Sequence, residues 1–339
     1  MHRSELTIDL GALRRNVRTL SRAAGEAELW AVVKAQAYGH GALGAARVVI
    51  AEGAKALCVA TVGEALPLRA EFPDTRILVM GPTDEVSAAR EARLDLAVGG
   101  GPIPEGVAVH LKLDTGMGRW GYSELPAPTR DVVGLMTHLA SADCDPEFTR
   151  TQVERFDAAT DGLRGLIRHA ANGAGTLRFP EAHFDAVRPG GALYGLSPFD
   201  TDPADDGLEP VLSWRSVLAQ VKLLRAGDST GYGREFVAVR DTWVGIVPVG
   251  YADGFRRSLS GTEVLVDGER RRVVGRISMD AFAVELSGDL AVGTPVTLIG
   301  DGLLIEEHAR AAGSLNYEVA CGIGIVARPE RTHTVFRDA

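Results

Sequence analysis

The segment GLIRHAANGAGTLRFPEAHFDAVRPGGALYG (165–195) contains two short apolar runs, each followed by a glycine-rich loop. The runs GLIRHAA (165–171) and FDAVRP (184–189) have the composition of buried parallel strands. The loops AANGAG (170–175) and RPGGALYG (188–195) could bring backbone N–H groups close to an anion. Consecutive units of this kind are typical of α/β folds, in which such loops gather at one end of a parallel sheet.

Six similar apolar runs precede this segment, and stretches of helical spacing lie between several of them. One such stretch is EFTRTQVERFDAATDGL (147–163), whose apolar residues can share one helix face. Eight strand–helix units predict an α/β fold with a (β/α)8 TIM-like barrel. An open doubly wound sheet is the competing fold, but its glycine fingerprint is missing after the first run. The predicted strands are 28–35, 56–62, 76–81, 94–99, 107–113, 132–140, 165–171 and 184–189.

The sequence pattern changes after Tyr194. The segment LSPFDTDPADDGLEP (196–210) is rich in Pro, Gly and acidic residues, as linkers often are. Alternating apolar and polar runs follow, and Asp267-Gly268 between two of them predicts a hairpin. We expect one helix in this part, EEHARAAG (306–313). The sequence therefore predicts a barrel domain over 1–205, whose first few residues could pack with the second domain. A mostly antiparallel β domain follows over 206–339.

Composition narrows the functional class. Hydrophobic residues make up 45% and charged residues 24% of the chain, which are globular proportions. A net charge of −9 disfavours nucleic acid or an anionic membrane as the main partner. No apolar run reaches the ~20 residues of a membrane helix. The three cysteines are too scattered for a disulfide framework or a zinc site, so we expect a cytoplasmic protein without a metal.

Lysine is rare in this chain. Only four of its 36 basic residues are lysine, namely Lys34, Lys55, Lys112 and Lys222. Arg cannot replace Lys in a Schiff base or a carbamate, because the guanidinium stays protonated. A lysine retained against such a bias is therefore a candidate for amine chemistry. Lys34 and Lys112 are the stronger candidates, because each lies at the end of a predicted strand.

Polar side chains follow the ends of several predicted strands, where barrel enzymes build their active sites. They are Lys34, Lys112, Arg119, His138, His169, Asn172 and Arg188. Each residue alone could be structural, but the group is harder to explain that way. A lysine at a strand end beside a phosphate-binding loop indicates pyridoxal phosphate (PLP) as the cofactor.

The stretch AVVKAQAYGHG (31–41) closely resembles the lysine motif of alanine racemases. Further motifs resemble that family in the family's order, from about residue 7 to 330. They are TIDLGALRRN (7–16), KLDTGMGRWG (112–121), THLASAD (137–143), HAANGAGTLR (169–178), RPGGALYG (188–195), GYADGF (250–255), GRISMD (275–280) and NYEVACG (316–322). The resemblance implies a PLP barrel of fold type III, a C-terminal β domain and a homodimer whose two active sites are each shared between subunits.

The resemblance also implies the reaction, which is the interconversion of L- and D-alanine through a PLP external aldimine by two bases. Lys34 would hold PLP and act as the base on one face of the substrate. Tyr251 of the partner subunit would be the opposite base. Both groups start near pKa ~10 and need their pKa lowered to work near neutral pH.

The remaining roles are implied in the same way. Tyr38, Asn172, Gly173, Gly190 and Tyr194 would help to bind the cofactor. Arg119 would lie by the PLP phenolic oxygen and the substrate, oriented by a carbamylated Lys112. His138 would pack against the pyridine ring, and Arg188 would pair with the pyridine nitrogen. Met279 of the partner subunit would offer a backbone N–H to the substrate carboxylate.

Three residues depart from the family pattern. Gln36 replaces the usual Asn, Gly173 replaces a phosphate-binding Ser, and Ile325 replaces a Tyr at the entrance. Losing two hydroxyl donors would weaken PLP binding, since a hydrogen bond to a charged group contributes ~1.5–3 kcal/mol. A smaller entrance residue would also admit side chains larger than methyl. We therefore expect racemisation of serine or a larger amino acid beside alanine.

Two alternatives remain open from the sequence. A PLP decarboxylase of the same fold type would pair the pyridine nitrogen with a carboxylate and use a cysteine in its second domain. Arg188 argues against this, whereas Cys321 keeps it open. A non-enzymatic PLP carrier would resemble the barrel alone, and the complete second domain counts against it.

Overall fold

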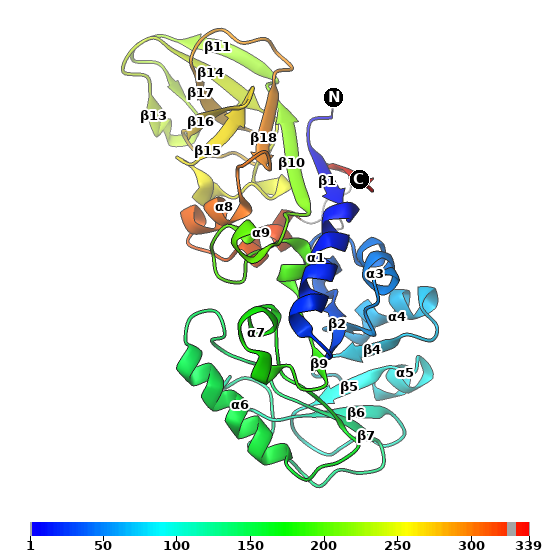
Figure 1. Cartoon of the computed structure of the whole chain (residues 1–339). Helices are drawn as coiled ribbons and strands as arrows, with labels where there is room; N and C mark the ends of the chain where they lie inside the picture. The colour runs from blue at the N-terminus through cyan, green and yellow to red at the C-terminus, as the bar shows by residue number, and fades with distance from the viewer. Residues whose placement is uncertain (1, 324–329, 339) are drawn as a thin grey trace. The chain divides into compact units, whose positions relative to one another are not determined.

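The computed structural model describes residues 2–323 and 330–338 (Figure 1). The chain divides into two compact units. One unit is Ala12–Glu209, and the other combines Met1–Gly11 with Pro210–Ala339. The sequence predicts a boundary at 205/206 with the first few residues packing with the second domain, and the β-rich unit does include the start of the chain. No helix among the described residues is long and apolar enough to cross a bilayer.

The unit Ala12–Glu209 is built around a closed barrel of eight strands, as the sequence predicts (Figure 1). Every neighbouring pair is parallel. The strands are shorter than predicted at their carboxyl ends, because the residues that follow leave the ladder to build the barrel mouth. They are β2 (Glu28–Val32), β3 (Ala56–Val59), β4 (Arg76–Val79), β5 (Asp95–Val98), β6 (Ala108–Lys112), β7 (Val132–Met136), β8 (Ile167–His169) and β9 (Ala186–Val187).

Side chains fill the barrel interior. One buried cluster contains Trp30, Cys58, Leu78 and Met136, together with small alanines that leave room for the indole ring. The Trp30 ring also lies against His169, with 4.7 Å between ring centroids. The interior is therefore a packed core that includes polar rings as well as aliphatic groups.

Helices lie between most successive strands of the barrel (Figure 1), but among the described residues none lies between β5 and β6 or between β6 and β7, so not all of the eight predicted strand–helix units are present. The predicted helix over 147–163 is confirmed as α6 (Pro146–Thr160). Asp145 caps its N-terminus, because the Asp145 carboxylate accepts a hydrogen bond from Phe148 N at 3.0 Å. Helix α4 (Val62–Glu71) begins with a capping box between Thr61 and Glu64. The other helices of the region are α1 (Leu10–Ala24), α2 (Lys34–Tyr38), α3 (Ala42–Ala51), α5 (Val86–Glu91) and α7 (Gly173–Arg178).

The second unit contains a sheet of nine strands in the order β11-β14-β17-β16-β15-β18-β10-β1-β19. All neighbours are antiparallel except β1 and β19, so the predicted β domain is confirmed with one parallel pair. A separate hairpin pairs β12 (Ser229–Thr230) with β13 (Phe236–Val237). The strands of the sheet are β1 (Glu5–Asp9), β10 (Leu212–Val217), β11 (Gln220–Leu224), β14 (Thr242–Val247), β15 (Glu263–Val266), β16 (Glu269–Val274), β17 (Phe282–Leu286), β18 (Pro295–Ile299) and β19 (His333–Arg337).

The predicted turn at Asp267-Gly268 joins β15 and β16, and both residues have positive φ, 51° and 80°. A two-residue hairpin turn of this handedness requires such angles, which Asp and Gly tolerate. The predicted helix over 306–313 is confirmed as α8 (Ile305–Ala312). The expectation of a single helix is wrong, because α9 (Asn316–Ile323) follows it.

Candidate active site

The barrel mouth collects most of the predicted site residues. Lys34 follows β2, Lys112 ends β6, His138 follows β7 and Arg188 follows β9. All of them lie in the unit Ala12–Glu209, at the carboxyl ends of parallel strands. The interactions below show that these side chains also lie near one another.

The segment after Lys34 is a left-handed turn. Ala35, Gln36, Ala37 and Tyr38 all have φ between 50° and 55°. Left-handed geometry costs a non-glycine residue roughly 1–2 kcal/mol, so four in succession persist only where surrounding contacts hold them. One such contact is the hydrogen bond from Ala35 N to the Glu64 carboxylate at 2.7 Å.

His40 supports the same turn from inside. Its Nδ1 lies 2.9 Å from the Ala37 carbonyl and 3.0 Å from the Tyr38 carbonyl, so Nδ1 carries a proton and donates to both. Burial lowers the pKa of His40 to about 4, which keeps the ring neutral. The ring stacks on Tyr194, whose hydroxyl donates to the Val32 carbonyl at 2.9 Å. A buried aromatic stack therefore fixes the strand end that carries Lys34.

Tyr38 extends from this turn toward the loop after β9. Its ring lies 5.5 Å from that of Tyr194, centroid to centroid. A Cβ added at Gly190 would lie 2.9 Å from Tyr38 Cζ and still closer to its hydroxyl. Only glycine therefore fits at position 190 beside this phenol.

Four cations surround the barrel mouth. Burial, followed by the charges of Arg119, Arg188 and Lys34, lowers the pKa of the Lys112 amine to about 8. Burial and the same four cations hold the pKa of His138 well below its ordinary value. Positive charges at close range oppose one another unless an anion lies among them. The arrangement is therefore suited to an anionic ligand.

A cavity opens beside Lys112 and Arg119. It has a volume of about 510 Å³, and its walls are mainly apolar, including Met80, Leu96 and Val98. Trp120 also lines it and lies under both cations, 5.5 Å from Lys112 Nζ and 5.1 Å from Arg119 Cζ to the ring centroid. A largely apolar cavity with a few charged groups is typical of a small-molecule site.

Arg188 is held by three acceptors. Its Nη1 donates to His169 Nδ1 at 2.6 Å, and its Nη2 donates to the Thr137 and Ala170 carbonyls at 2.7 and 3.1 Å. The side chain is 2% exposed, and burial lowers its pKa to about 10. Arg188 is therefore a fixed buried cation at neutral pH.

The hydrogen-bond chain continues from His169 across the barrel. Its Nε2 lies 2.8 Å from His110 Nδ1, and His110 Nε2 lies 3.1 Å from the Asp95 carboxylate. Arginine can only donate, so His169 Nδ1 accepts and its Nε2 carries the proton. His110 must then accept at Nδ1 and donate from Nε2 to Asp95. Burial lowers the pKa of both histidines, so both are neutral and each has a single tautomer.

Sequence reasoning missed Asp95 and His110 as members of this chain. A signal was available for His110, because it lies two residues before Lys112 in an otherwise apolar strand. Residues two apart in a strand share a face, so both side chains belong to the barrel interior. Asp95 begins β5 and pairs in register with Ala108, which gives no local signal of a role.

The predicted phosphate-binding loop contains Asn172 and Gly173. The Asn172 side-chain oxygen accepts from Gly175 N at 2.9 Å and so caps α7. A Cβ at Gly173 would lie 3.1 Å from the Ala192 Cβ, which leaves little room for a larger residue. Gln36 accepts from Ala42 N at 3.3 Å, at the start of α3. Ile325 lies outside the described residues, so the expectation for the entrance stays a prediction.

Tyr251 and Met279 lie in the other unit, on two loops joined by backbone hydrogen bonds. Tyr251 N donates to the Ser278 carbonyl at 3.1 Å, and Ala252 N donates to the Met279 carbonyl at 3.0 Å. Their side chains are 39% and 51% exposed. The structure thus brings the predicted residues together in two groups, one within each unit.

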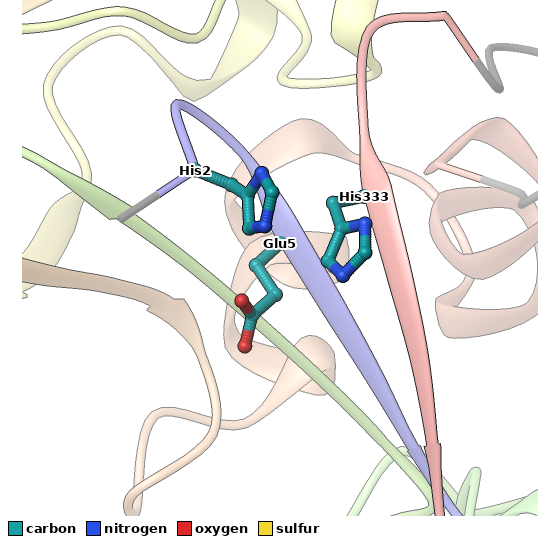
Figure 2. Close-up of side chains that lie close together, drawn as sticks. All are labelled: His2, Glu5 and His333. Carbon is teal, nitrogen blue, oxygen red and sulfur yellow. The ribbon is translucent and has the colours of Figure 1, made fainter.

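Three potential metal ligands also lie together in the second unit. Ligand atoms of His2, Glu5 and His333 all lie within 4.8 Å of one another (Figure 2). The two imidazoles are stacked, however, with centroids 3.9 Å apart and 20° between their planes. Nitrogen lone pairs lie in the ring plane, so stacked rings cannot both direct them at one ion. We assign no metal to this cluster, and the expectation of a site without a metal stays a prediction.

Comparison with known proteins covers nearly the whole chain. Residues 8–101 and 103–198 match the family model for the alanine racemase N-terminal domain, and residues 211–332 match the model for the alanine racemase C-terminal domain. The alanine racemase of Streptomyces coelicolor is 42% identical over 95% of this chain and 94% of its own length. Alanine racemase 1 of Bacillus subtilis is 39% identical over 93% and 90%. The solved alanine racemase from Streptomyces coelicolor A3(2) superposes with a TM-score of 0.89 at 40% identity, over 99% and 98% of the two chains.

Proposed function

The chain belongs to the alanine racemase family, and from that premise we propose that it interconverts L- and D-alanine with pyridoxal phosphate as cofactor. The observation that carries the proposal is the group of four cations at the barrel mouth, which includes Lys34. The charges of all four cations lower the pKa of His138, and those of Lys34, Arg119 and Arg188 also lower the pKa of Lys112. The four side chains therefore lie near one another. The fold, the family and this charge arrangement agree with one another.

The barrel mouth fits PLP in charge. A phosphate and a phenolate would offset the four cations that otherwise repel one another. Glycine at 190 lets its loop approach the Tyr38 phenol closely, and the glycines at 173 and 175 let the other loop pack closely against Ala192 and Leu139. Lys34 supplies the amine to which the cofactor aldehyde would attach. Tyr38, Asn172, Gly173, Gly190 and Tyr194 are the further residues proposed to hold it.

Bound PLP supplies electron withdrawal, which makes the α-proton of an amino acid removable. Lys34 then takes or returns that proton at its Nζ on one face of the substrate. The neutral amine is the form that can accept a proton. Arg119 would pair with the anionic groups of cofactor and substrate, and His138, whose pKa burial and the nearby cations hold well below its ordinary value, would pack against the cofactor ring.

Arg188 would hold the pyridine nitrogen of the cofactor. Its three acceptors fix the guanidinium, and even at a pKa of about 10 it keeps its proton at neutral pH. A fixed cation there disfavours protonation of the pyridine nitrogen and so limits the spread of charge from the α-carbon. Return of the proton to the α-carbon would thereby be favoured over other reactions of the deprotonated amino acid. A decarboxylase would need a carboxylate at this position, so Arg188 favours the racemase.

The second base in this proposal is Tyr251 of the partner subunit. Racemisation needs a proton donor on the face opposite Lys34, and one side chain cannot readily serve both faces. Met279 of the partner subunit offers its N–H to the substrate carboxylate. This arrangement requires a homodimer with two shared sites. We also propose a cytoplasmic protein without nucleic-acid or membrane partners. Its functional domains would be a barrel over 1–205, whose first residues pack with the second domain, and a β domain over 206–339.

Lys112 is proposed to carry a carbamate. Burial and neighbouring cations lower its pKa to about 8, so an appreciable part of the amine is neutral at pH 7. The Nζ lone pair forms a bond to the carbon of CO₂, one C=O bond opens to a carboxylate, and one proton is released. Counted from the protonated amine, which first loses a proton of its own, two protons leave and the charge of the side chain changes from positive to negative. The carbamate would then accept hydrogen bonds from Arg119 and reduce repulsion at the barrel mouth.

A chiral amino-acid assay on the purified protein tests the reaction. We expect L-alanine to give D-alanine without loss of CO₂, with serine or a larger amino acid as a slower second substrate. Release of CO₂ and an amine would support the decarboxylase instead. Borohydride treatment and peptide mapping should find the pyridoxyl group on Lys34. A label on Lys55 or Lys222 would contradict the assignment of Lys34.

A further inference from the structure

The loops that carry Tyr251 and Met279 rest on one buried carboxylate. Asp253 ends the 3-10 turn Tyr251–Asp253, and its side chain has no exposed surface. Two backbone hydrogen bonds join this turn to residues 278–279, as described above. A Cβ at Gly250 would lie 2.5 Å from the Met279 carbonyl carbon, so glycine permits the close approach of the two loops.

Two arginines clamp this carboxylate from opposite ends of the chain. Arg3 donates from Nη1 to Oδ1 at 2.9 Å and from Nη2 to Oδ2 at 3.2 Å. Arg331 donates from Nε to Oδ1 at 2.8 Å and from Nη2 to Oδ2 at 3.3 Å. Gly250 N donates a fifth hydrogen bond, at 2.8 Å. Burial alone would raise the pKa of Asp253, but the hydrogen bonds from both arginines outweigh it and hold the pKa below its usual value.

The same two arginines, Arg3 and Arg331, also form hydrogen bonds with the loop that carries Met279. Arg331 Nη2 donates to the carboxylate of Asp280 at 2.5 Å, and Arg3 Nη2 donates to the Asp280 carbonyl at 3.4 Å. Arg3 Nη1 donates to the Arg331 carbonyl at 3.2 Å, which joins the two arginines to each other. Asp280 directly follows Met279. One guanidinium group therefore fixes both loops, and the two cations balance the two anions.

One arginine would be enough to pair with a buried carboxylate, because a single bidentate pair supplies the charge and the geometry. The second arginine and the link to Asp280 add rigidity between the two loops. Rigidity matters here because the Tyr251 and Met279 side chains are 39% and 51% exposed in this unit. Their positions depend on the backbone beneath them.

We propose that Arg3 and Arg331 are positioning residues for the part of the active site that this chain donates to its partner. The proposal rests on the proposed function, because it takes Tyr251 as a base and Met279 as the donor to the substrate carboxylate. Misplacing a reacting group by about 1 Å can cost ~100-fold in rate. By holding both loops in one geometry, Arg3 and Arg331 fix the positions of Tyr251 and Met279, on which the reaction rate depends.

The substitution Arg331→Lys tests the proposal in the intact dimer loaded with PLP. Lysine keeps the charge but not the planar fork, so it cannot bind Asp253 and Asp280 together. We expect kcat for alanine to fall by about tenfold or more. The visible absorbance of bound PLP should not change, because Lys34 lies in the other unit. Arg225→Lys is the matched control, since Arg225 forms an exposed ion pair with Asp241 in the same unit, and its kcat should equal that of the wild type.

A directional isotope effect separates positioning from general damage. Tyr251 and Lys34 act on opposite faces, so a displaced Tyr251 slows proton removal from one enantiomer only. Tyr251 returns the proton in the opposite direction, so with alanine deuterated at the α-carbon, Arg331→Lys should show a larger isotope effect for one enantiomer and a smaller one for the other. A uniform loss of kcat with both isotope effects unchanged would overturn the proposal, as would a kcat equal to that of the control.

Asp280→Ala provides a second variant that does not put the fold at risk, since the Asp280 side chain is 64% exposed. It removes the link between Arg331 and the Met279 loop, and we expect a smaller loss of kcat with a raised KM for alanine. Unchanged kinetics in this variant would refute the clamp even where Arg331→Lys failed to fold. A wild-type protein that does not racemise alanine would overturn the proposed function and this proposal with it. Racemisation by the wild type, with both variants unaffected, would overturn this proposal alone.

Discussion

Gly134→Ala should break the buried chain that ends on Arg188. Gly134 in β7 pairs in register with His110 in β6, and the imidazole lies over the glycine. A Cβ at position 134 would lie 2.6 Å from His110 Cε1 and closer still to Nδ1. His110 is fully buried in a strand of the barrel, so its ring cannot swing into solvent. The ring must shift and lose its contacts with His169 and Asp95.

The expected loss of stability follows from these contacts. The His110–Asp95 hydrogen bond involves a charged group and contributes about 1.5–3 kcal/mol, and the His110–His169 bond contributes about 0.5–1.5 kcal/mol. Forcing a methyl group into a packed interior adds roughly 1–3 kcal/mol. We therefore expect the free energy of unfolding to fall by about 3–7.5 kcal/mol, the sum of these three contributions.

Urea unfolding of the PLP-free protein, followed by tryptophan fluorescence, measures this loss. The Trp30 ring lies 5.6 Å from His110 and 4.7 Å from His169, centroid to centroid, so its emission should also change in the folded state. Gly63→Ala is the control, because a Cβ there meets only Thr61 Oγ1 at 3.9 Å and the residue lies in α4. A Gly134→Ala protein within about 1 kcal/mol of the wild type would refute the argument, since that is well below the low end of the summed loss, about 3 kcal/mol.

Three further predictions concern the barrel. The unfolded chain binds a proton at His40 below pH ~6.5, whereas the folded protein, with a His40 pKa of about 4, does not. Stability should therefore fall by about 3 kcal/mol as the pH drops from 6.5 to 4, and urea unfolding of His40→Gln at both pH values should show less of this fall. Gly190→Ala should displace Tyr38 and weaken PLP binding about tenfold or more, measured by cofactor titration; an unchanged dissociation constant would contradict the contact. ¹³CO₂ should produce a carbamate NMR signal that Lys112→Arg lacks, and a signal shared by both proteins would exclude Lys112 as its source.

The barrel could be predicted because its strands are apolar over their whole length and are separated by helical spacing. The residue at which each strand ends could not be predicted from the local sequence. The predicted strand 132–140 ends at Met136, because Thr137 and His138 leave the ladder to face the barrel mouth. Nor does any sequence rule predict the left-handed turn at Ala35–Tyr38, which contains no glycine. Contacts from Glu64, His40 and Tyr194 override its local preference.

Long-range pairing explains the other differences. The start of the chain was expected to pack with the second domain, but its partners were not predicted: strand β1 pairs with β10 and β19, which only contacts across the whole sequence reveal. Helix α9 did carry a signal, because its buried residues Asn316, Val319, Ala320 and Ile323 follow helical spacing. It was missed because the segment is short and its capping is not evident in the sequence. The hydrogen bond from Asn316 to Glu306 of α8, at 2.9 Å, comes from tertiary packing.

Mixing two inactive variants tests the central claim most directly, namely that Lys34 and Tyr251 of the partner subunit form one working pair. Lys34→Ala and Tyr251→Phe should each be nearly inactive when refolded alone. After unfolding, mixing in equal amounts and refolding, random pairing makes about half the dimers mixed, and half of their sites contain both bases. The mixture should therefore regain about a quarter of wild-type racemase activity. If both bases came from one chain, every chain would still lack one of them. A mixture as inactive as its two components would contradict the shared site and the role of Tyr251 in it.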